Sequence, residues 1–272
     1  MSQEQVQAFI TLLTVMTTSQ KGEDINAASS QLSELIQTPN ALFSLLYIFQ
    51  LPQELHIRKA AAVIFDHALK QGIQASYTPE QNIQMKKAIL SIIASDPDFQ
   101  LRIFLCDLIN FENPEILAAL LQDIINLARG LCSKSENDFS TTGLYLWSLI
   151  SQIMPKESVP GMISELIPIS TAALNSDNST TRVYAAKLLS AVLWRAVDIE
   201  SEQTIEEIVQ LLLTVLHKAF YESQNIQEVH SLIFSITEIL DTPTGNFENY
   251  EFHFAAFGLQ IMRDESLPLA LR

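Results

Sequence analysis

Apolar residues recur every three or four positions along almost the whole chain, and prolines interrupt this pattern at short intervals. The spacing is clear at Val6, Phe9, Ile10, Leu13 and Met16, and it places these side chains on one face of an α-helix. A proline disfavours the helical conformation in the residue before it, so it marks a turn between helices. The interrupting prolines are Pro39, Pro52, Pro79, Pro97, Pro114, Pro155 and Pro243.

This pattern predicts about thirteen helices joined by short turns. Their expected ranges are 3–18, 24–37, 40–50, 54–72, 79–95, 98–111, 114–132, 138–154, 159–175, 179–198, 201–222, 225–241 and 246–263. A further helix is expected to begin near Glu265. The stretch from Phe247 to Phe254 alternates, as a strand would. Because the chain offers no partner strand, we favour an aromatic helix face there.

A helix–turn–helix unit over residues 163–193 has a skeleton that recurs along the chain. Asp177 lies in its turn, and Arg182 lies early in its second helix, ahead of alanines and leucines. The same skeleton surrounds Arg58 and Arg102. These arginines are 44 and 80 residues apart, which fits one and two periods of 40–44 residues. A helix-pair repeat of this length is typical of HEAT and armadillo solenoids.

We therefore predict an all-α fold, a right-handed α-α superhelix of HEAT repeats with six to seven helix pairs, forming a single domain over residues 1–272. One amphipathic pair cannot cover its own apolar stripe, whereas stacked pairs share a continuous core. The aspartates and arginines of the skeleton can link successive turns. The skeleton weakens at 138–154, where Thr142 and Gly143 replace it, and at 225–241. The alternative is a globular helix bundle in which the spacing is coincidental.

Composition excludes several other classes. Seven glycines among 272 residues, with 48% hydrophobic and 17% charged residues, exclude collagen, disordered tails and glycine-rich phosphate-binding folds. A β-sandwich or barrel is disfavoured for the same reason. The two cysteines cannot form a disulfide framework, which favours a reducing compartment. Apolar runs of only a few residues, and a first segment without a basic or apolar region, predict neither a membrane span nor a secretory signal.

The sequence shows no arrangement that requires catalysis. Glycine-rich nucleotide loops, nucleophile elbows and zinc-protease motifs are missing from it. The histidines are scattered without the spacing of metal ligands, and Cys106 lies among apolar neighbours as a small buried residue would. We expect a protein that is not an enzyme and holds no cofactor and no metal.

The chain is acidic, with 31 acidic and 16 basic residues and a formal net charge of −15. Residues 198–251 alone hold eleven acidic residues and one basic residue, Lys218, for a net charge of −10. This charge disfavours direct binding to nucleic acid or to an anionic membrane. The acidic segment either attracts a basic protein or only keeps the surface solvated, and charge alone favours the second interpretation.

Residues 27–70 read AASSQLSELIQTPNALFSLLYIFQLPQELHIRKAAAVIFDHALK, and this segment resembles the N-terminal region of the importin-β (karyopherin-β) superfamily. The family pattern is matched at Gln31, Leu32, Leu35, Pro39, Leu45, Leu46, Ile48, Arg58, Ala60, Ala61 and Ala62. Arg102, Cys106 and Asp107 resemble the second helix of the family's third repeat. The later spacing is most similar to the importin branch that carries ribosomal proteins and histones.

The resemblance implies a transport receptor of the cytoplasm, nucleus and nuclear pore, of which this chain is the N-terminal part. Such receptors bind cargo and the GTP form of the small GTPase Ran on their concave face, and Phe-Gly nucleoporins on their convex face. By position, the Ran-binding candidates are Gln31, Glu34, Arg58, Asp66, Lys70 and Asp107. The candidates for binding basic cargo are Glu206, Glu228, Glu238 and Asp241. Another HEAT scaffold, such as a phosphatase or trafficking subunit, is the alternative function.

The sequence departs from the family pattern at three places. The family has a basic residue or asparagine near Asp66 and His67, and a Trp-Pro pair near Asn113 and Pro114. The fourth repeat also lacks its arginine. These departures bear on the Ran contact more than on the fold.

Overall fold

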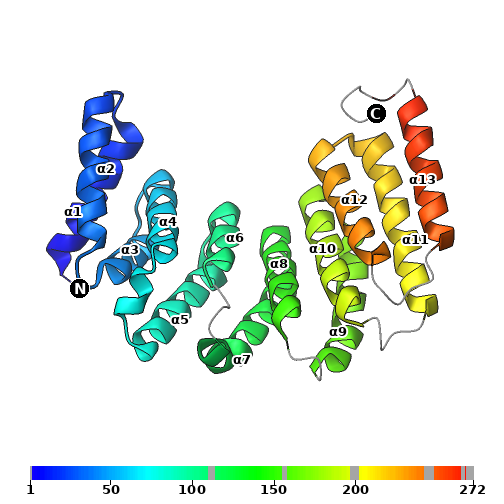
Figure 1. The fold of residues 1–272 in the computed structure, drawn as a ribbon, viewed down its shortest axis with the longest axis horizontal. Helices are drawn as coiled ribbons and strands as arrows, with labels where there is room; N and C mark the ends of the chain where they lie inside the picture. The colour runs from blue at the N-terminus through cyan, green and yellow to red at the C-terminus, as the bar shows by residue number, and fades with distance from the viewer. Residues whose placement is uncertain are drawn as a thin grey trace. The chain divides into compact units, whose positions relative to one another are not determined.

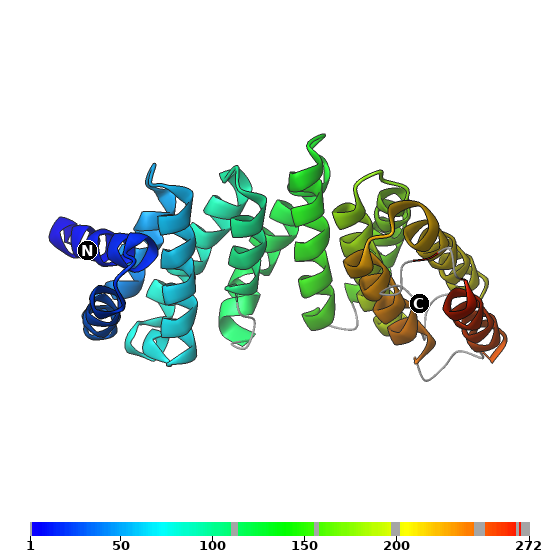
Figure 2. The same cartoon turned by 90° about the horizontal axis from the view of Figure 1, so that it is seen from above.

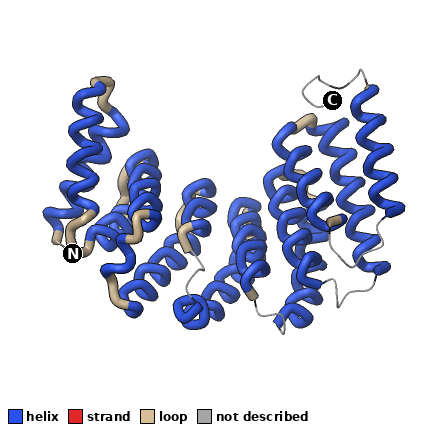
Figure 3. The backbone as a smooth tube through the Cα atoms, viewed as in Figure 1, coloured by secondary structure: helices blue, strands red, loops and turns tan. Residues whose placement is uncertain are grey.

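The computed structural model describes residues 2–109, 114–154, 158–196, 202–241, 248–264 and 267, with backbone only at 159–160, 194–196, 202–206 and 248–253. The described residues form helices and short connections without a strand (Figure 3). The chain divides into two compact units, 1–124 and 125–272, and each is treated separately below. The expectation of one uninterrupted repeat domain stays a prediction.

The first unit consists of stacked helical hairpins (Figure 1). Its helices are α1 (Gln3–Thr18), α2 (Gly22–Ile36), α3 (Ala41–Gln50), α4 (Leu55–Lys70), α5 (Pro79–Ser95) and α6 (Phe99–Asp107), with a 3-10 turn η1 (Ile73–Ser76) between α4 and α5. Helix α2 packs on α1, α4 on α3 and α6 on α5. Phe49 and Phe65 meet edge to face at 5.7 Å between ring centroids in the core of the second hairpin.

The helix boundaries follow local sequence chemistry. Helix α5 begins with a capping box, in which Thr78 and Gln81 satisfy each other's backbone N–H groups ahead of Pro79. The Asp98 carboxylate caps α6 by accepting a hydrogen bond from the Leu101 N–H at 2.7 Å. Gly72 adopts a φ of 77° after α4, which glycine tolerates without strain. This turn leads into η1, a 3-10 turn that the apolar spacing does not indicate.

Helix α7 (Pro114–Cys132) contains the boundary between the units. The second unit continues with α8 (Asn137–Ile153), α9 (Val159–Leu174), α10 (Ser179–Ala196), α11 (Glu202–Lys218), a π-helical turn η3 (Ala219–Ser223), α12 (Ile226–Leu240) and α13 (Glu248–Arg263). Helix α10 packs against α8, α9 and α12. Figures 1 and 2 show α8, α10 and α12 side by side and running in the same direction.

The core of the second unit is the one that the repeat predicts. Ala185, Ala186, Leu188 and Leu189 are each fully buried on α10. The small alanines allow α8 and α9 to approach closely, while the leucines fill the space between neighbouring hairpins. The shared core between helix pairs is therefore confirmed within this unit.

Most predicted helices appear within a few residues of their expected ranges, and the differences have local causes. The range 201–222 divides into α11 and η3, because the backbone widens into a π-helical turn that ends at Gln224 with a φ of 46°. Residues 248–254 are helical, as we favoured over a strand, whereas Phe247 lies outside the described residues. The helix expected from Glu265 also lies outside them, except for Leu267. In the part of the chain that the structure describes, no helix is both long and apolar enough to cross a membrane.

Candidate functional site

Helix α4, the second helix of the second hairpin, presents a largely polar stripe on one face. Lys59, Val63, Asp66 and Lys70 follow one another at spacings of four, three and four, so they share one helix face. Val63 is 56% exposed, which is high for a branched apolar residue. The Lys70 ammonium lies 2.6 Å from the Asp66 carboxylate. The stripe therefore combines an exposed apolar residue with both signs of charge, as protein-binding surfaces often do.

The neighbouring second helices place other predicted Ran-binding residues at the surface. Gln31 and Glu34 are exposed on α2, three positions apart and therefore on one face. Asp107 is exposed at the end of α6. Lys59 connects α4 to the start of α6 through a 2.9 Å hydrogen bond to the Gln100 side chain and a 3.4 Å ion pair with Asp98. We therefore keep five residues as predicted Ran contacts: Gln31, Glu34, Asp66, Lys70 and Asp107.

Arg58 has a different environment from the other Ran-binding candidates. Its Nε donates a hydrogen bond to the Phe49 carbonyl at 3.1 Å, and its guanidinium is paired with the Asp96 carboxylate. Both side chains are largely buried, with 12% and 5% exposure. Arg102, fully buried on α6, donates to the Asp96 carbonyl. Arg58 thus links its hairpin to the next one through Asp96, and Arg102 donates to the same aspartate within its own hairpin. Arg58 belongs to this internal arginine ladder and not to the exposed stripe.

The ladder continues in the second unit with different partners. Arg182 pairs with Glu228 and donates from Nη1 to the Ser176 carbonyl at 2.7 Å. Helix α8, the second helix of the fourth hairpin, has no arginine, and the hydroxyls of Thr141 on α8 and Thr181 on α10 form a buried hydrogen bond of 2.7 Å. A hydrogen-bonded threonine pair therefore links these two helices where the repeat lacks its arginine.

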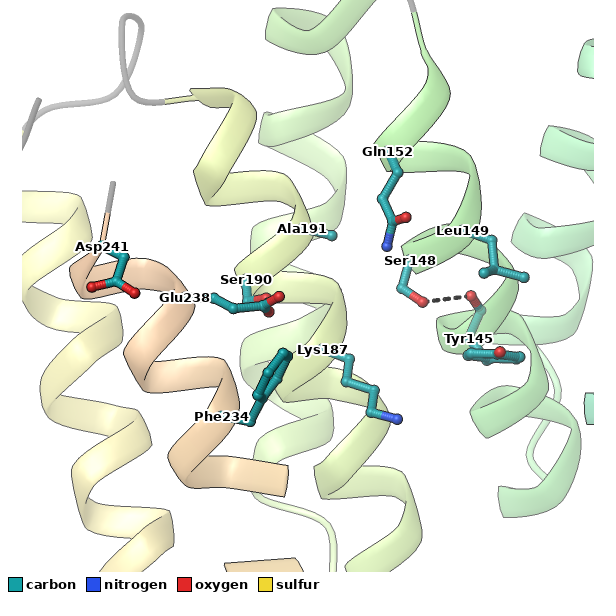
Figure 4. A pocket seen from close by; sticks show the side chains of 10 residues that line it. All are labelled: Tyr145, Ser148, Leu149, Gln152, Lys187, Ser190, Ala191, Phe234, Glu238 and Asp241. Carbon is teal, nitrogen blue, oxygen red and sulfur yellow. Dashed lines mark hydrogen bonds between the residues drawn. The ribbon is translucent and has the colours of Figure 1, made fainter. Parts of the chain in front are cut away.

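A groove of about 610 Å³ lies on the second helices of the second unit (Figure 4). We call it the α8–α10–α12 groove. It is lined by Tyr145, Ser148, Leu149 and Gln152 of α8, by Lys187, Ser190 and Ala191 of α10, and by Phe234, Glu238 and Asp241 of or directly after α12. Because three successive hairpins each contribute one wall, the groove exists only when the repeats are stacked.

The groove contains an aromatic centre and charges at its ends. Phe234 is 58% exposed, and in Figure 4 its ring lies below Glu238 and to the left of the Lys187 side chain. The hydroxyl of Ser190 donates to the Glu238 carboxylate. Lys187 Nζ lies 5.2 Å from the centre of the Tyr184 ring. The Tyr184 ring in turn contacts Tyr145 of the groove wall, with 4.9 Å between ring centroids and the planes tilted by 58°. A ligand in this groove would meet aromatic surface and charge of both signs.

The predicted cargo-binding residues fall into three groups. Glu238 and Asp241 are exposed and line the groove. Glu228 is 1% exposed, so the expectation that it contacts cargo is corrected, because its carboxylate accepts hydrogen bonds from Arg182 at 2.6 Å and from Ser223 at 3.0 Å. The side chain of Glu206 lies outside the described residues.

The sequence-based prediction missed Phe234, Lys187 and Tyr145. Phe234, Glu238 and Asp241 follow one another at spacings of four and three, so the sequence alone could have placed them on one helix face. The opposite walls were not, because they come from residues about 40 to 90 positions earlier in the chain.

Both thiols have raised pKa values. Burial raises the pKa of Cys106, which is fully buried as expected, and the negative charge of Asp107 adds to this effect. Burial also raises the pKa of Cys132 to about 12, with a smaller contribution from Glu165. Both thiols are therefore protonated at neutral pH, and a protonated thiol is a poor nucleophile. Among the described residues, no group of three or more histidine, cysteine or carboxylate side chains has the arrangement of a metal site.

Comparisons with known proteins place these surfaces in a family context. Residues 28–95 match the Importin-beta N-terminal domain. A comparison with curated proteins gave no match. Among solved structures, Kap121p bound to Pho4p has a TM-score of 0.70 over 99% of this chain, and Kap121p and Kap121p bound to Nup53p have TM-scores of 0.69 and 0.68 over 100% of it. Sequence identity is 15% in each case.

At that identity the structural likeness shows the fold, which is the all-α HEAT-repeat solenoid that the sequence predicts. The chain spans about a quarter of the length of these structures, 26% in each. The match over residues 28–95 includes α4 and its exposed stripe. Residues 28–95 therefore resemble the Importin-beta N-terminal domain, and the chain shares its HEAT-repeat fold with Kap121p.

Proposed function

We propose that this chain acts in a nuclear transport receptor, by binding alone, through the exposed faces of its second helices. The observation that carries the proposal is the match to the Importin-beta N-terminal domain over residues 28–95, the segment that presents the stripe on α4. In this account the protein moves between cytoplasm and nucleus through the nuclear pore. It has no catalytic role.

The proposed Ran-GTP surface consists of Gln31 and Glu34 on α2, Asp66 and Lys70 on α4, and Asp107 on α6. Four of these five residues lie inside the matched segment. Exposed charges of this kind steer association and set specificity more than they add affinity. The buried Arg58 stabilises the position of α4 under this surface, because its ion pair with Asp96 links α4 to the next hairpin.

The proposed cargo surface is the α8–α10–α12 groove, where Glu238 and Asp241 would attract basic segments of cargo. Kap121p, which shares the fold, has been solved bound to Nup53p, Pho4p, Ste12p and the SUMO protease Ulp1p. By analogy, we include cargo proteins and Phe-Gly nucleoporins among the partners of this chain. Ribosomal proteins and histones, which are strongly basic, are the cargo class that the sequence resemblance favours.

A binding comparison tests the proposal on the Ran surface. Immobilised Ran loaded with a non-hydrolysable GTP analogue should retain the chain, and Ran loaded with GDP should not. The double variant Asp66→Lys, Lys70→Glu should weaken retention, because it exchanges the two charges and keeps their mutual ion pair. The matched control exchanges Lys87 and Asp123, an exposed pair on α5 and α7 at 3.4 Å, and it should leave retention unchanged.

Equal retention by both nucleotide forms, or equal effects of the two charge exchanges, would contradict the Ran proposal. A different HEAT scaffold, of the phosphatase or trafficking subunit type, would then become the better explanation. Such a protein would bind a folded partner whose affinity does not depend on the nucleotide state of Ran.

A further inference from the structure

The α8–α10–α12 groove carries charges of opposite sign toward its two ends. It therefore differs from a uniformly acidic surface, which would attract any basic ligand. Lys187 is exposed, and its ammonium points in Figure 4 away from Glu238 and Asp241. A uniformly basic ligand would place one of its charges against Lys187. The groove therefore discriminates between ligands that differ in the order of their charges.

Helix direction reinforces this polarity. Helices α8, α10 and α12 run in the same direction, and Asp241 directly follows the last residue of α12. The carboxylates thus lie toward the C-terminal ends of the helices, where the helix dipoles are negative. The Lys187 ammonium extends toward the N-terminal ends, as helical side chains do. The carboxylates and the C-terminal ends of α8 and α12 favour a basic group at one end of the groove, and the Lys187 charge favours an acidic group at the other.

We infer that the groove binds an extended peptide, and this inference rests on the proposed cargo function. In this peptide an acidic, an apolar and a basic side chain follow one another on one face. The apolar side chain packs on Phe234, the basic one meets Glu238 and Asp241, and the acidic one meets Lys187. Phe234 and Glu238 are four residues apart, about 6 Å along a helix. Alternate residues of an extended chain face the same side and lie about 6.6 Å apart, so the apolar and basic side chains of a five-residue segment match this spacing.

The exposure of Phe234 supports an occupant with an apolar centre. An aromatic side chain that is 58% exposed, in a groove that the aliphatic Leu149 and Ala191 also line, offers apolar surface that water solvates poorly. The charged ends then fix the register of the ligand, since a shifted segment would bring like charges together.

Fluorescence anisotropy with three labelled peptides tests this inference on the full chain. The peptides share a Gly-Ser flank and carry Glu-Ser-Leu-Ser-Lys, Lys-Ser-Leu-Ser-Lys or Glu-Ser-Leu-Ser-Glu at the centre. They are compared at physiological ionic strength, where the Debye length of about 8 Å limits long-range attraction to the acidic chain. The mixed-charge peptide should bind about fivefold more tightly than either of the others.

Two pairs of variants test whether the peptides bind in the groove. Lys187→Glu should make the all-basic peptide the preferred ligand, whereas Lys218→Glu, the same charge change on α11 outside the groove, should leave the preference as it is. Phe234→Ser should weaken all three peptides. Ile226→Ser, at a residue 51% exposed on the same helix and outside the groove, should weaken none of them.

Wild-type protein that prefers the all-basic peptide would overturn the inferred polarity while leaving a basic-cargo surface in place. Binding of none of the peptides, or equal effects of Lys187→Glu and Lys218→Glu, would overturn the groove as the binding site. Neither result bears on the Ran comparison, so failure of this inference and failure of the proposed function are distinguishable.

Discussion

Arg182 of α10 donates a hydrogen bond of 2.6 Å from Nε to Glu228 Oε1 of α12, and the two side chains are 4% and 1% exposed. The two residues are 46 positions apart in the sequence, and their buried ion pair joins two successive hairpins. Ser223 of the π-helical turn donates to the other carboxylate oxygen at 3.0 Å, so the pair also fixes the connection between α11 and α12. The same two helices form two of the groove walls.

Glu228→Gln should destabilise the second unit strongly. The substitution leaves the Arg182 guanidinium buried without a compensating charge, which costs about 3–5 kcal/mol of unfolding free energy. Urea unfolding monitored by circular dichroism measures the loss. The double variant Arg182→Met, Glu228→Leu should recover most of it, because apolar residues remove both buried charges.

Glu222→Gln is the matched control, since Glu222 is 67% exposed on the neighbouring turn. Its unfolding free energy should stay within about 0.5 kcal/mol of wild type. A similar loss for Glu222→Gln and Glu228→Gln would show that the buried pair has no special role in this interface.

Gly143→Ala should destabilise the protein, because α8 passes very close to α7 at this residue. A Cβ at position 143 would lie 2.7 Å from Cys132 Sγ, 2.8 Å from Cys132 N and 2.9 Å from Ala128 O. Backbone atoms cannot move aside cheaply, so the overpacked interface should lose about 1–3 kcal/mol of unfolding free energy. This explains why glycine replaces the repeat pattern in the fourth hairpin.

Gly130→Ala, in α7, should have the opposite effect and stabilise the protein. No atom lies within 4 Å of a Cβ built there, and the residue is exposed in a helix. Alanine should therefore raise the unfolding free energy by about 0.5–1 kcal/mol. If the two substitutions shifted the urea midpoint in the same direction, the close approach of α7 and α8 would be wrong.

The pair of Arg129 and Glu165 should make stability depend on pH. Arg129 donates from Nε and Nη2 to the two carboxylate oxygens at 2.7 and 2.6 Å, and these hydrogen bonds lower the pKa of Glu165. A lowered pKa in the folded state stabilises the protein above the unfolded pKa of about 4.3, and this contribution is lost as pH falls through the folded value. Because Arg129 is half exposed, the contribution is about 0.5–1 kcal/mol.

Comparing wild type with Glu165→Gln measures this contribution. The wild type should be more stable at pH 7, and the difference should shrink between pH 5 and pH 3 as Glu165 becomes neutral. A difference that stays constant over this range would mean that the Glu165 charge does not stabilise the fold.

Cys132 should react slowly with alkylating reagents in the folded protein. Its pKa is raised to about 12 by burial, against about 8.5 for a free thiol, so the thiolate fraction at pH 8 falls on the order of a thousandfold. Timed alkylation, digestion and mass spectrometry report Cys106 and Cys132 separately. Both should be slow in buffer and fast in urea, and a fast reaction of Cys132 in buffer would contradict its packing against α8.

The helices and the shared core were predictable because their signals are local. Capping residues such as Thr78 and Asp98, the turn prolines and the period of apolar residues act within a few positions of one another. The arginine ladder was partly predictable. The spacing of Arg58, Arg102 and Arg182 indicated a link between repeats, and the structure shows the partners.

The groove was not predictable from the sequence to the same extent. It depends on the register between helices, which places Ser190 of α10 against Glu238 of α12, 48 residues later. That register is set by tertiary packing and has no local signal. Tertiary packing also decides which acidic side chains are buried. Glu228 and Glu238 belong to one acidic segment, yet packing turns the first into the core and the second to the surface.

The most direct test of a transport function is the affinity of the full chain for Ran in its two nucleotide states, measured by isothermal titration calorimetry. The account predicts binding to Ran loaded with a GTP analogue at least about tenfold tighter than to Ran loaded with GDP, a difference of about 1.4 kcal/mol in binding free energy. Equal affinities for the two forms, or binding to neither, would contradict it.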